Sequence, residues 1–230
     1  MEIPVKVSMQ NLRFIHIPKC GGSSIWEIYK LKPQHKARHW DAQPVPNKIN
    51  FAVIRNPYSR IQSIFAHGKD LYNQLTNLKY FDTLDDLAIA YFDSLHPNHL
   101  IAIAMFNWSK SKLLTEEPST KHRCVDTSNN LIHFAPQSIF IIQDKGFNAD
   151  TPLILLRLEY LAQDLQYYID RGKLPPLPPG ANTNLVTNKS SSKNKARAQM
   201  TPIIVKLVRT VYKRDLELYE KVYGHPATIS

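Results

Sequence analysis

The chain has 230 residues, of which 43% are hydrophobic and 21% charged, as in an ordinary soluble globular protein. This length suits a single domain, which we expect to extend over residues 1–230. The formal net charge of +10 favours a polyanionic partner, although a generally basic, soluble surface is the simpler alternative. No stretch approaches the roughly 20 consecutive apolar residues that a membrane-spanning helix requires.

The cysteine content and the first residues bear on the compartment. Cys20 and Cys124 are too few for a disulfide framework, which favours a reducing environment. Residues 1–10 lack the apolar core of a secretory signal. We therefore expect a cytoplasmic protein, with an excised lumenal domain as the alternative. The spacing of Cys and His follows no metal-binding pattern, so we expect no metal.

The first half of the chain alternates apolar strands with helical patterns. Residues 13–17 predict a short buried strand, and after a turn with two glycines residues 24–30 predict a helix. Residues 51–54 predict a second strand. Asn56 and Pro57 then start another helix, because Asn is favoured as a helix N-cap and Pro at the first helical position.

The remaining elements continue this alternation. They are a helical pattern (83–108), a polar loop (114–130), two strands (138–142 and 153–156), a helix (160–170), a long mobile loop (175–195) and a final helix (202–223). Strands that alternate with helices predict an α/β fold with three layers, in which helices flank a mostly parallel central sheet.

A glycine pair marks the first candidate anion site. Gly21 and Gly22 are two of only seven glycines, and they lie between a predicted strand and a predicted helix in the run IPKCGGSS of residues 17–24. Such a turn lets backbone N–H groups converge on an oxyanion at the positive end of the helix dipole. A capping box or a glycine turn that binds nothing is the alternative. The run is not a Walker A loop, because Lys19 precedes the glycines.

A basic residue at the end of the second strand marks the second candidate anion site. Arg55 offers a planar fork of donors suited to phosphate, and Ser63 lies about two turns into the following helix. Each alone also fits an ordinary structural role. Two such strand-to-helix turns in one chain suit a nucleotide with phosphates at both ends of its ribose.

Together the two segments resemble the cofactor-binding motifs of sulfotransferases that use 3′-phosphoadenosine 5′-phosphosulfate (PAPS). The likeness is greatest to the Golgi-type carbohydrate branch, with the heparan sulfate 2-O-, chondroitin and HNK-1 sulfotransferases, and to its bacterial relatives. The first motif of that branch resembles residues 16–24 (HIPKCGGSS), and the second resembles residues 51–63 (FAVIRNPYSRIQS). Residues 133–137 (HFAPQ), 156–161 (LRLEYL), 188–190 (NKS) and 212–215 (YKRD) resemble its later motifs more loosely.

The resemblance implies a P-loop-NTPase-like fold and in-line transfer of a sulfuryl group from PAPS to a hydroxyl acceptor, which leaves adenosine 3′,5′-bisphosphate (PAP). It implies no metal and a glycan or small alcohol as acceptor, and it leaves the oligomeric state open. Lys19 would contact the sulfuryl group and the bridging oxygen. The residues implied for donor binding are Lys19, Cys20, Gly21, Gly22, Ser23, Ser24, Arg55, Ser63 and Lys189.

Transfer to a hydroxyl needs a general base, and histidine suits this role near neutral pH. In the relatives like 2-O-sulfotransferase the base precedes the strand of the second motif. His39 holds the matching place, which makes it our prediction, and His35 is the nearest alternative. His16, within the first strand, is expected to be structural, and His133 suits either the acceptor side or a brace for its loop.

Two other classes of function stay open. A kinase or other phosphotransferase on a similar sheet would bind ATP rather than the bisphosphate. A non-enzymatic module for binding polyanions would explain the charge alone, but no nucleic-acid motif is present, so we expect no nucleic-acid partner.

Overall fold

A computed structural model describes residues 7–32, 36–37, 47–71, 77–107, 132–141, 153–183 and 192–229. The chain divides into two compact units, which are described separately. The first unit comprises Met1–Arg55 and Phe140–Asn188, and the second comprises Asn56–Ile139 and Lys189–Ser230. Each unit has its own cluster of buried hydrophobic side chains.

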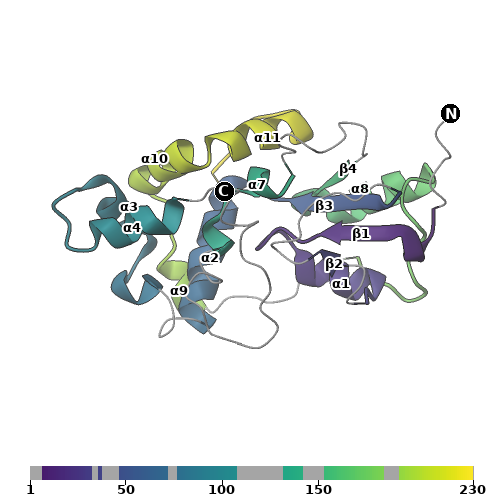
Figure 1. Ribbon diagram of the computed structural model, residues 1–230, viewed down its shortest axis with the longest axis horizontal. Coiled ribbons are helices and arrows are strands. Elements are labelled where there is room, and N and C mark those ends of the chain that lie inside the picture. Colours follow the sequence, from purple (N-terminus) through teal and green to yellow (C-terminus); the bar gives the residue numbers. More distant parts are fainter. Residues whose placement is uncertain are drawn as a thin grey trace. The chain divides into compact units, whose positions relative to one another are not determined.

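A parallel sheet forms the centre of the first unit (Figure 1). Its strands are β1 (Leu12–Ile15), β2 (Lys36–Ala37), β3 (Ile49–Ile54) and β4 (Leu153–Arg157). They lie in the order β2-β1-β3-β4, and every neighbouring pair is parallel. The α/β class and the three strands predicted at 13–17, 51–54 and 153–156 are confirmed, whereas the short β2 was not predicted.

Alternate residues of the strands build the hydrophobic cluster of the first unit. Phe14 lies opposite Phe51 in the register of β1 and β3, and Phe51 lies opposite Ile154 of β4. Helices α1 (Gly22–Tyr29) and α8 (Leu161–Asp170) cover this face through side chains such as Ile25 and Leu165. The opposite face of β3 is buried as well, so the strand is covered on both sides.

The proline-rich segment after α8 contains no helix or strand, as predicted for a loop. It is nevertheless tied to the first unit, because the hydroxyl of Tyr29 donates to the carbonyl of Pro175 at 3.3 Å. Burial of this hydroxyl raises the pKa of Tyr29 well above its ordinary value.

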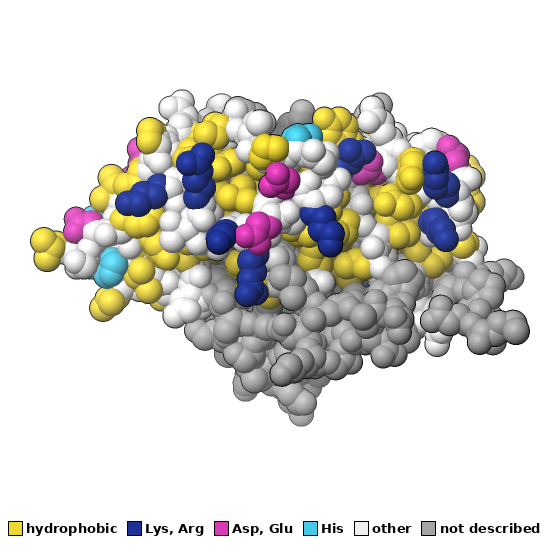
Figure 2. Space-filling view, turned by 90° about the horizontal axis from the view of Figure 1, so that it is seen from above, with side chains coloured by type: hydrophobic (Ala, Val, Ile, Leu, Met, Phe, Trp, Pro, Cys, Tyr) yellow, Lys and Arg dark blue, Asp and Glu magenta, His cyan; other side chains and the backbone are white. Residues whose placement is uncertain are grey.

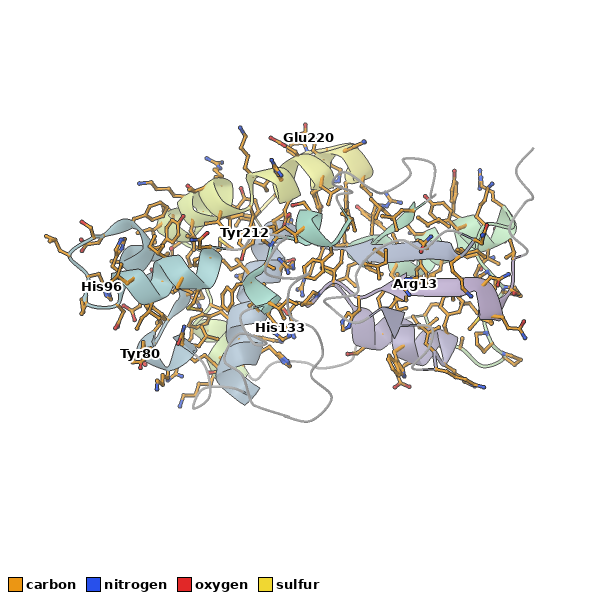
Figure 3. All side chains as sticks on the ribbon, in the orientation of Figure 1. Arg13, Tyr80, His96, His133, Tyr212 and Glu220 are labelled. Atoms are coloured by element: carbon orange, nitrogen blue, oxygen red, sulfur yellow. The ribbon has the colours of Figure 1, made fainter. Side chains whose placement is uncertain are left out.

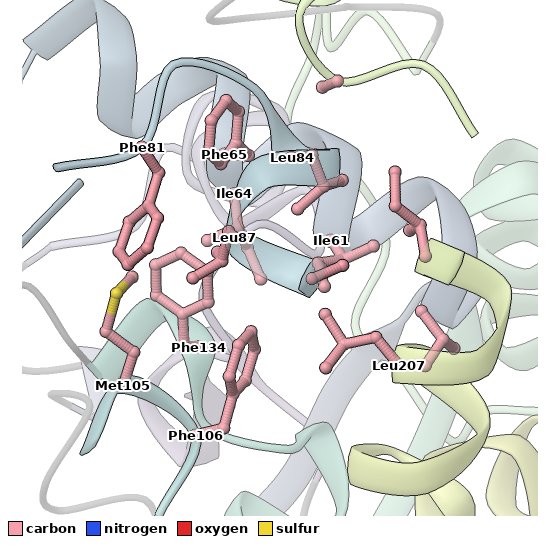
Figure 4. Close-up of a cluster of buried hydrophobic side chains, with 14 of the residues drawn as sticks. Ile61, Ile64, Phe65, Phe81, Leu84, Leu87, Met105, Phe106, Phe134 and Leu207 are labelled. Carbon is pink, nitrogen blue, oxygen red and sulfur yellow. The ribbon is translucent and has the colours of Figure 1, made fainter. Parts of the chain in front are cut away.

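The second unit is helical within the residues described. Its helices are α2 (Pro57–Leu71), α3 (Leu84–Phe92), α4 (His99–Phe106), α9 (Ser192–Ala196), α10 (Pro202–Val211) and α11 (Lys213–Tyr223). Short elements complete both units: η1 (Met9–Asn11), η3 (Asn77–Tyr80), η4 (Ile132–Phe134), α7 (Gln137–Ile141) and η5 (Leu158–Tyr160). Side chains of α2, α3, α4 and α10 form the core of this unit, in which Ile61, Phe65, Leu87, Phe106 and Leu207 pack together (Figure 4).

The strand predicted at 138–142 is wrong, because residues 137–141 form helix α7. The carboxylate of Asp215 accepts the N–H of Gln137 at 2.7 Å and that of Ser138 at 2.9 Å, and so caps the first turn. A short apolar run does not distinguish a strand from a buried helix by its pattern alone. The cap that decides the outcome comes from a residue far along the chain.

Two long helical predictions are each divided in the structure. The pattern over 83–108 gives α3 and α4, separated at a turn that contains Pro97. The final helix bends at Tyr212 into α10 and α11, although it starts at Pro202 and ends at Gly224 with φ +77° as predicted. Within the predicted loop over 175–195, residues from Ser192 form helix α9.

Candidate functional site

The glycine-rich turn at the carboxyl end of β1 is closed by a backbone hydrogen bond and continues into helix α1. The N–H of Cys20 donates to the carbonyl of Ile17 at 3.3 Å, which closes the turn. Gly21 has φ +76°, and its carbonyl accepts the N–H of Ile25 in the first helical turn of α1 at 3.1 Å. The loop therefore leads directly into a helix start, where partial positive charge favours an oxyanion.

Lys19 adopts φ +64°, a left-handed conformation that is uncommon for a residue with a side chain. Such a conformation is retained where the surrounding structure fixes it. The guanidinium of Arg55, at the end of β3, contributes here, since its Nη1 donates to the carbonyl of Lys19 at 3.2 Å. Because β1 and β3 are adjacent and parallel, their carboxyl ends meet at one edge of the sheet. The first motif and the arginine of the second motif therefore converge.

Side chains pack closely against both loop glycines. A Cβ atom on Gly22 would collide with the imidazole of His16. A Cβ atom on Gly21 would lie 2.5 Å from Cδ1 of Leu158, and the positive φ adds to the strain. His16 itself stacks on Phe14 with ring centroids 5.8 Å apart, and its ring packs against the loop at Gly22.

Leu158 is placed by the turn that follows β4. Asp164 of α8 accepts the backbone N–H of Arg157 at 2.7 Å, and it also accepts Nε at 3.0 Å and Nη2 at 2.5 Å from the same residue. This paired carboxylate fixes the chain at the residue just before Leu158. Residues 156–161, which resemble one of the later motifs, therefore support the glycine loop through Leu158, whose side chain lies close to Gly21.

The other predicted donor-site residues occupy different positions. Cys20 is buried in the glycine turn, whereas Ser24 is buried and Ser23 half-buried in the first turn of α1. Ser63 is half-buried on α2, in the second unit, and its contact with a 3′-phosphate stays a prediction. Lys189 and the two candidate bases, His39 and His35, lie outside the described residues, and their roles stay predictions too.

The later motifs meet in a buried polar network of the second unit. Arg60 is 1% exposed, and its Nη2 donates to the carbonyls of His133 at 3.1 Å and Ala135 at 2.8 Å. Its Nη1 lies 4.0 Å from a carboxylate oxygen of Asp215. The hydroxyl of Tyr212 donates to the carbonyl of Phe134 at 2.8 Å. Figure 3 shows His133 and Tyr212 in this unit.

This network fixes residues 132–138 to α2 and α11. Burial raises the pKa of the Asp215 carboxyl, while the guanidinium of Arg60 and the N–H groups of Ser138 and Gln137 oppose the rise. Burial likewise raises the pKa of the Tyr212 hydroxyl. The sequence pointed to residues 133–137 and 212–215 as possible motifs, but it did not predict that they would join through a buried polar network. The signal available was Arg60 itself, a charged residue in a helix that also carries the apolar Ile61 and Ile64.

The imidazole of His133 lies near a second imidazole, that of His67 on α2, with ring centroids 6.3 Å apart. Its carbonyl is one of the two that Arg60 holds. The loop is thus held through the main chain of His133, and the role of its imidazole stays a prediction.

Basic side chains are exposed along α10 and α11. Lys206, Arg209, Lys213, Arg214 and Lys221 are exposed there, with Glu217 and Glu220 among them. On the face in Figure 2, the dark blue basic side chains are spread among apolar ones and exceed the acidic ones. Within the described ranges, no group of three or more His, Cys, Asp or Glu residues is arranged to hold a metal ion. None of the described helices combines the length and apolar character of a membrane span.

These elements define an α/β protein in which the first strand of a parallel sheet runs through a glycine turn into a helix, with Lys19 and Arg55 at the same edge of the sheet. The sequence matches the sulfotransferase family over residues 8–223, and the chain therefore belongs to that family. The fold accordingly agrees with the P-loop-NTPase-like architecture that the resemblance implied. No curated protein and no solved structure matches the chain significantly.

Proposed function

We propose that this chain transfers the sulfuryl group of PAPS to a hydroxyl acceptor, with PAP as the other product. Membership of the sulfotransferase family supports sulfuryl transfer in general. The observation that carries the finer proposal is the contact between Arg55 and the carbonyl of Lys19. It brings a basic residue suited to the 3′-phosphate and a lysine suited to the 5′-phosphosulfate to the same edge of the sheet.

The residues of the glycine loop fit such a donor. The turn has no side chain at Gly21 or Gly22, where a Cβ atom would collide with its surroundings, so the main chain itself lines the loop. The N–H groups at the start of α1 would bind the 5′-phosphosulfate, assisted by the hydroxyls of Ser23 and Ser24. Arg55 and Ser63 would bind the 3′-phosphate.

In the proposed reaction the acceptor oxygen forms a bond to sulfur as the bond between sulfur and the bridging oxygen breaks. The hydroxyl proton passes to a general base, for which His39 is proposed and His35 is the alternative. The electron pair of the broken bond stays on the bridging oxygen, and the ammonium of Lys19 stabilises the charge that develops there. The products are a sulfate ester, PAP and the protonated base.

A carbohydrate is the acceptor that we propose, with a small alcohol as the alternative. The resemblance to the Golgi-type branch supports a carbohydrate, and the exposed basic residues of α10 and α11 would favour an anionic one. The cytoplasmic location expected from composition stays a prediction.

A transfer assay with radiolabelled PAPS over a panel of glycans and small alcohols tests the proposal. We expect Lys19→Ala to lower transfer by at least about 100-fold, the usual effect of removing one group that stabilises transition-state charge. Lys32→Ala, which changes an exposed lysine of the same unit, is the matched control and should retain activity. Undiminished transfer by Lys19→Ala would refute the mechanism, whereas undiminished transfer by His39→Ala would remove only that base.

Calorimetry distinguishes the remaining alternatives. Binding of PAP without binding of ATP is expected for a sulfotransferase. Binding of ATP with turnover would indicate a kinase. Salt-dependent binding of heparin without any transfer from PAPS would indicate a non-enzymatic module.

A further inference from the structure

Asn56 links the candidate phosphate ligand Arg55 to helix α2. Its side-chain Oδ1 accepts the N–H of Tyr58 at 2.9 Å, and its backbone carbonyl accepts the N–H of Arg60 at 2.9 Å. These are the contacts of a helix N-cap. The side chain is buried, with 7% of the residue exposed.

The other half of the same amide contacts a segment from the far end of the sequence. Nδ2 of Asn56 donates to the backbone carbonyl of Thr228 at 2.7 Å. Since the N–H of Tyr58 only donates and the carbonyl of Thr228 only accepts, the orientation of the amide is determined by its two partners. A carboxylate at this position would accept the N–H of Tyr58 but would offer no donor to the carbonyl of Thr228.

Residues 225–229, which we name the strap, are held to the second unit at further points. Gly224 ends α11 in a left-handed conformation with φ +77°, which turns the chain away from the helix axis. The ring of His225 meets Tyr219 and Tyr223 edge-on, each at 5.9 Å between centroids. Ala227 packs against the hydrophobic core of the unit.

We propose that the strap controls the affinity for the phosphorylated donor, with Asn56 as the positioning residue that couples it to Arg55. This coupling rests on the proposed function of Arg55 as a ligand of the 3′-phosphate. Asn56 follows Arg55 directly, and the planar peptide between them leaves few backbone torsions free. Fixing the Asn56 side chain to the strap therefore restricts the backbone from which the guanidinium extends, and less entropy is lost when a phosphate binds.

The test uses the full chain and PAP as the probe. Asn56→Ser retains a neutral oxygen for the N–H of Tyr58, but its one hydroxyl ends a bond short of the position of Nδ2 and so loses the donor that spans to the carbonyl of Thr228. We expect PAP to bind about three- to tenfold more weakly, the usual effect of losing one hydrogen bond. The KM for PAPS should rise by a similar factor while kcat at saturating PAPS stays unchanged, a separation that general unfolding would not produce.

A second perturbation acts from the other side of the same contact. Ala227→Gln crowds the packed side of the strap and should weaken PAP binding in the same way. Thr228→Ala is the matched control, because only the backbone carbonyl of Thr228 is used, and it should bind PAP like the wild type. Coupling is reciprocal, so bound PAP should slow amide hydrogen exchange at residues 227–229 in the wild type but not in Asn56→Ser.

The outcomes separate the two proposals. If the wild type does not bind PAP, the proposed function fails. If the wild type binds PAP and both Asn56→Ser and Ala227→Gln bind it equally tightly, the role of the strap is refuted while the donor site stands. Unchanged hydrogen exchange on PAP binding would also refute the coupling.

Discussion

Replacing Asp215 by alanine tests whether the buried network of the second unit holds that unit together. The change removes the carboxylate that faces Arg60 at 4.0 Å and that accepts the N–H groups of Gln137 and Ser138. The side chains of Arg60 and Asp215 are 2% and 0% exposed, so water does not replace the lost partner without opening the structure.

The expected loss of stability is large. Breaking a buried ion pair from one side costs about 3–5 kcal/mol, because an uncompensated charge stays buried. Two unsatisfied N–H groups cost about 1–3 kcal/mol each, although these contributions are not additive. We therefore expect a loss of about 5 kcal/mol or more in the free energy of unfolding, against the 5–15 kcal/mol typical of a whole domain.

Urea denaturation followed by circular dichroism and tryptophan fluorescence measures this loss. Amide hydrogen exchange at residues 137–141 should accelerate more than elsewhere, since α7 loses its cap. Glu217→Ala, an exposed acidic residue on the same helix, is the matched control and should change stability by no more than about 0.5 kcal/mol. A loss below about 1 kcal/mol for Asp215→Ala would refute the reasoning.

Two further predictions concern other sites. Gly21→Ala should abolish PAP binding and should lower the free energy of unfolding by about 1–3 kcal/mol more than Gly180→Ala does. Both glycines have positive φ, but only at Gly21 would the added Cβ atom meet a side chain, that of Leu158. Equal melting temperatures of the two variants would contradict this prediction. Burial lowers the pKa of Lys69, so the folded state releases this proton at lower pH than the unfolded chain does. The wild type should therefore gain stability relative to Lys69→Met as the pH rises towards the unfolded pKa of about 10.4. Urea titrations of both proteins between pH 7 and pH 10 measure the difference, and a stability difference independent of pH would show that Lys69 keeps an ordinary pKa.

The parts of the fold that depend on local sequence were predictable. A strand, a glycine pair and a helix are encoded within residues 13–30, and the N-cap and proline at Asn56 and Pro57 start α2 as expected. The same holds for the boundary at Gly224. Lys19 and Arg55 were predicted in two separate anion sites, and they meet because parallel neighbouring strands end at the same edge of the sheet.

The parts that depend on distant partners were not predictable. The segment at 137–141 has the pattern of a strand, but Asp215 supplies the cap that makes it a helix. The contact of Leu158 with Gly21 likewise joins residues from different strands and leaves no periodic pattern in the sequence. A hydrogen bond such as that from Asn56 to the carbonyl of Thr228 carries no signal at all, because any residue supplies a carbonyl.

The order of strands in the sheet has a consequence for how the chain folds. β3 and β4 are direct neighbours, yet roughly 100 residues separate them, and closing a loop of that length costs about 4 kcal/mol of chain entropy. The pairing of β1 with β3 closes a much shorter loop, so we expect it to form earlier, with β4 docking last. Leu158 follows β4 and forms one wall of the glycine turn. A chain emerging from the ribosome would therefore complete its glycine turn only after β4 and Leu158 had been synthesised.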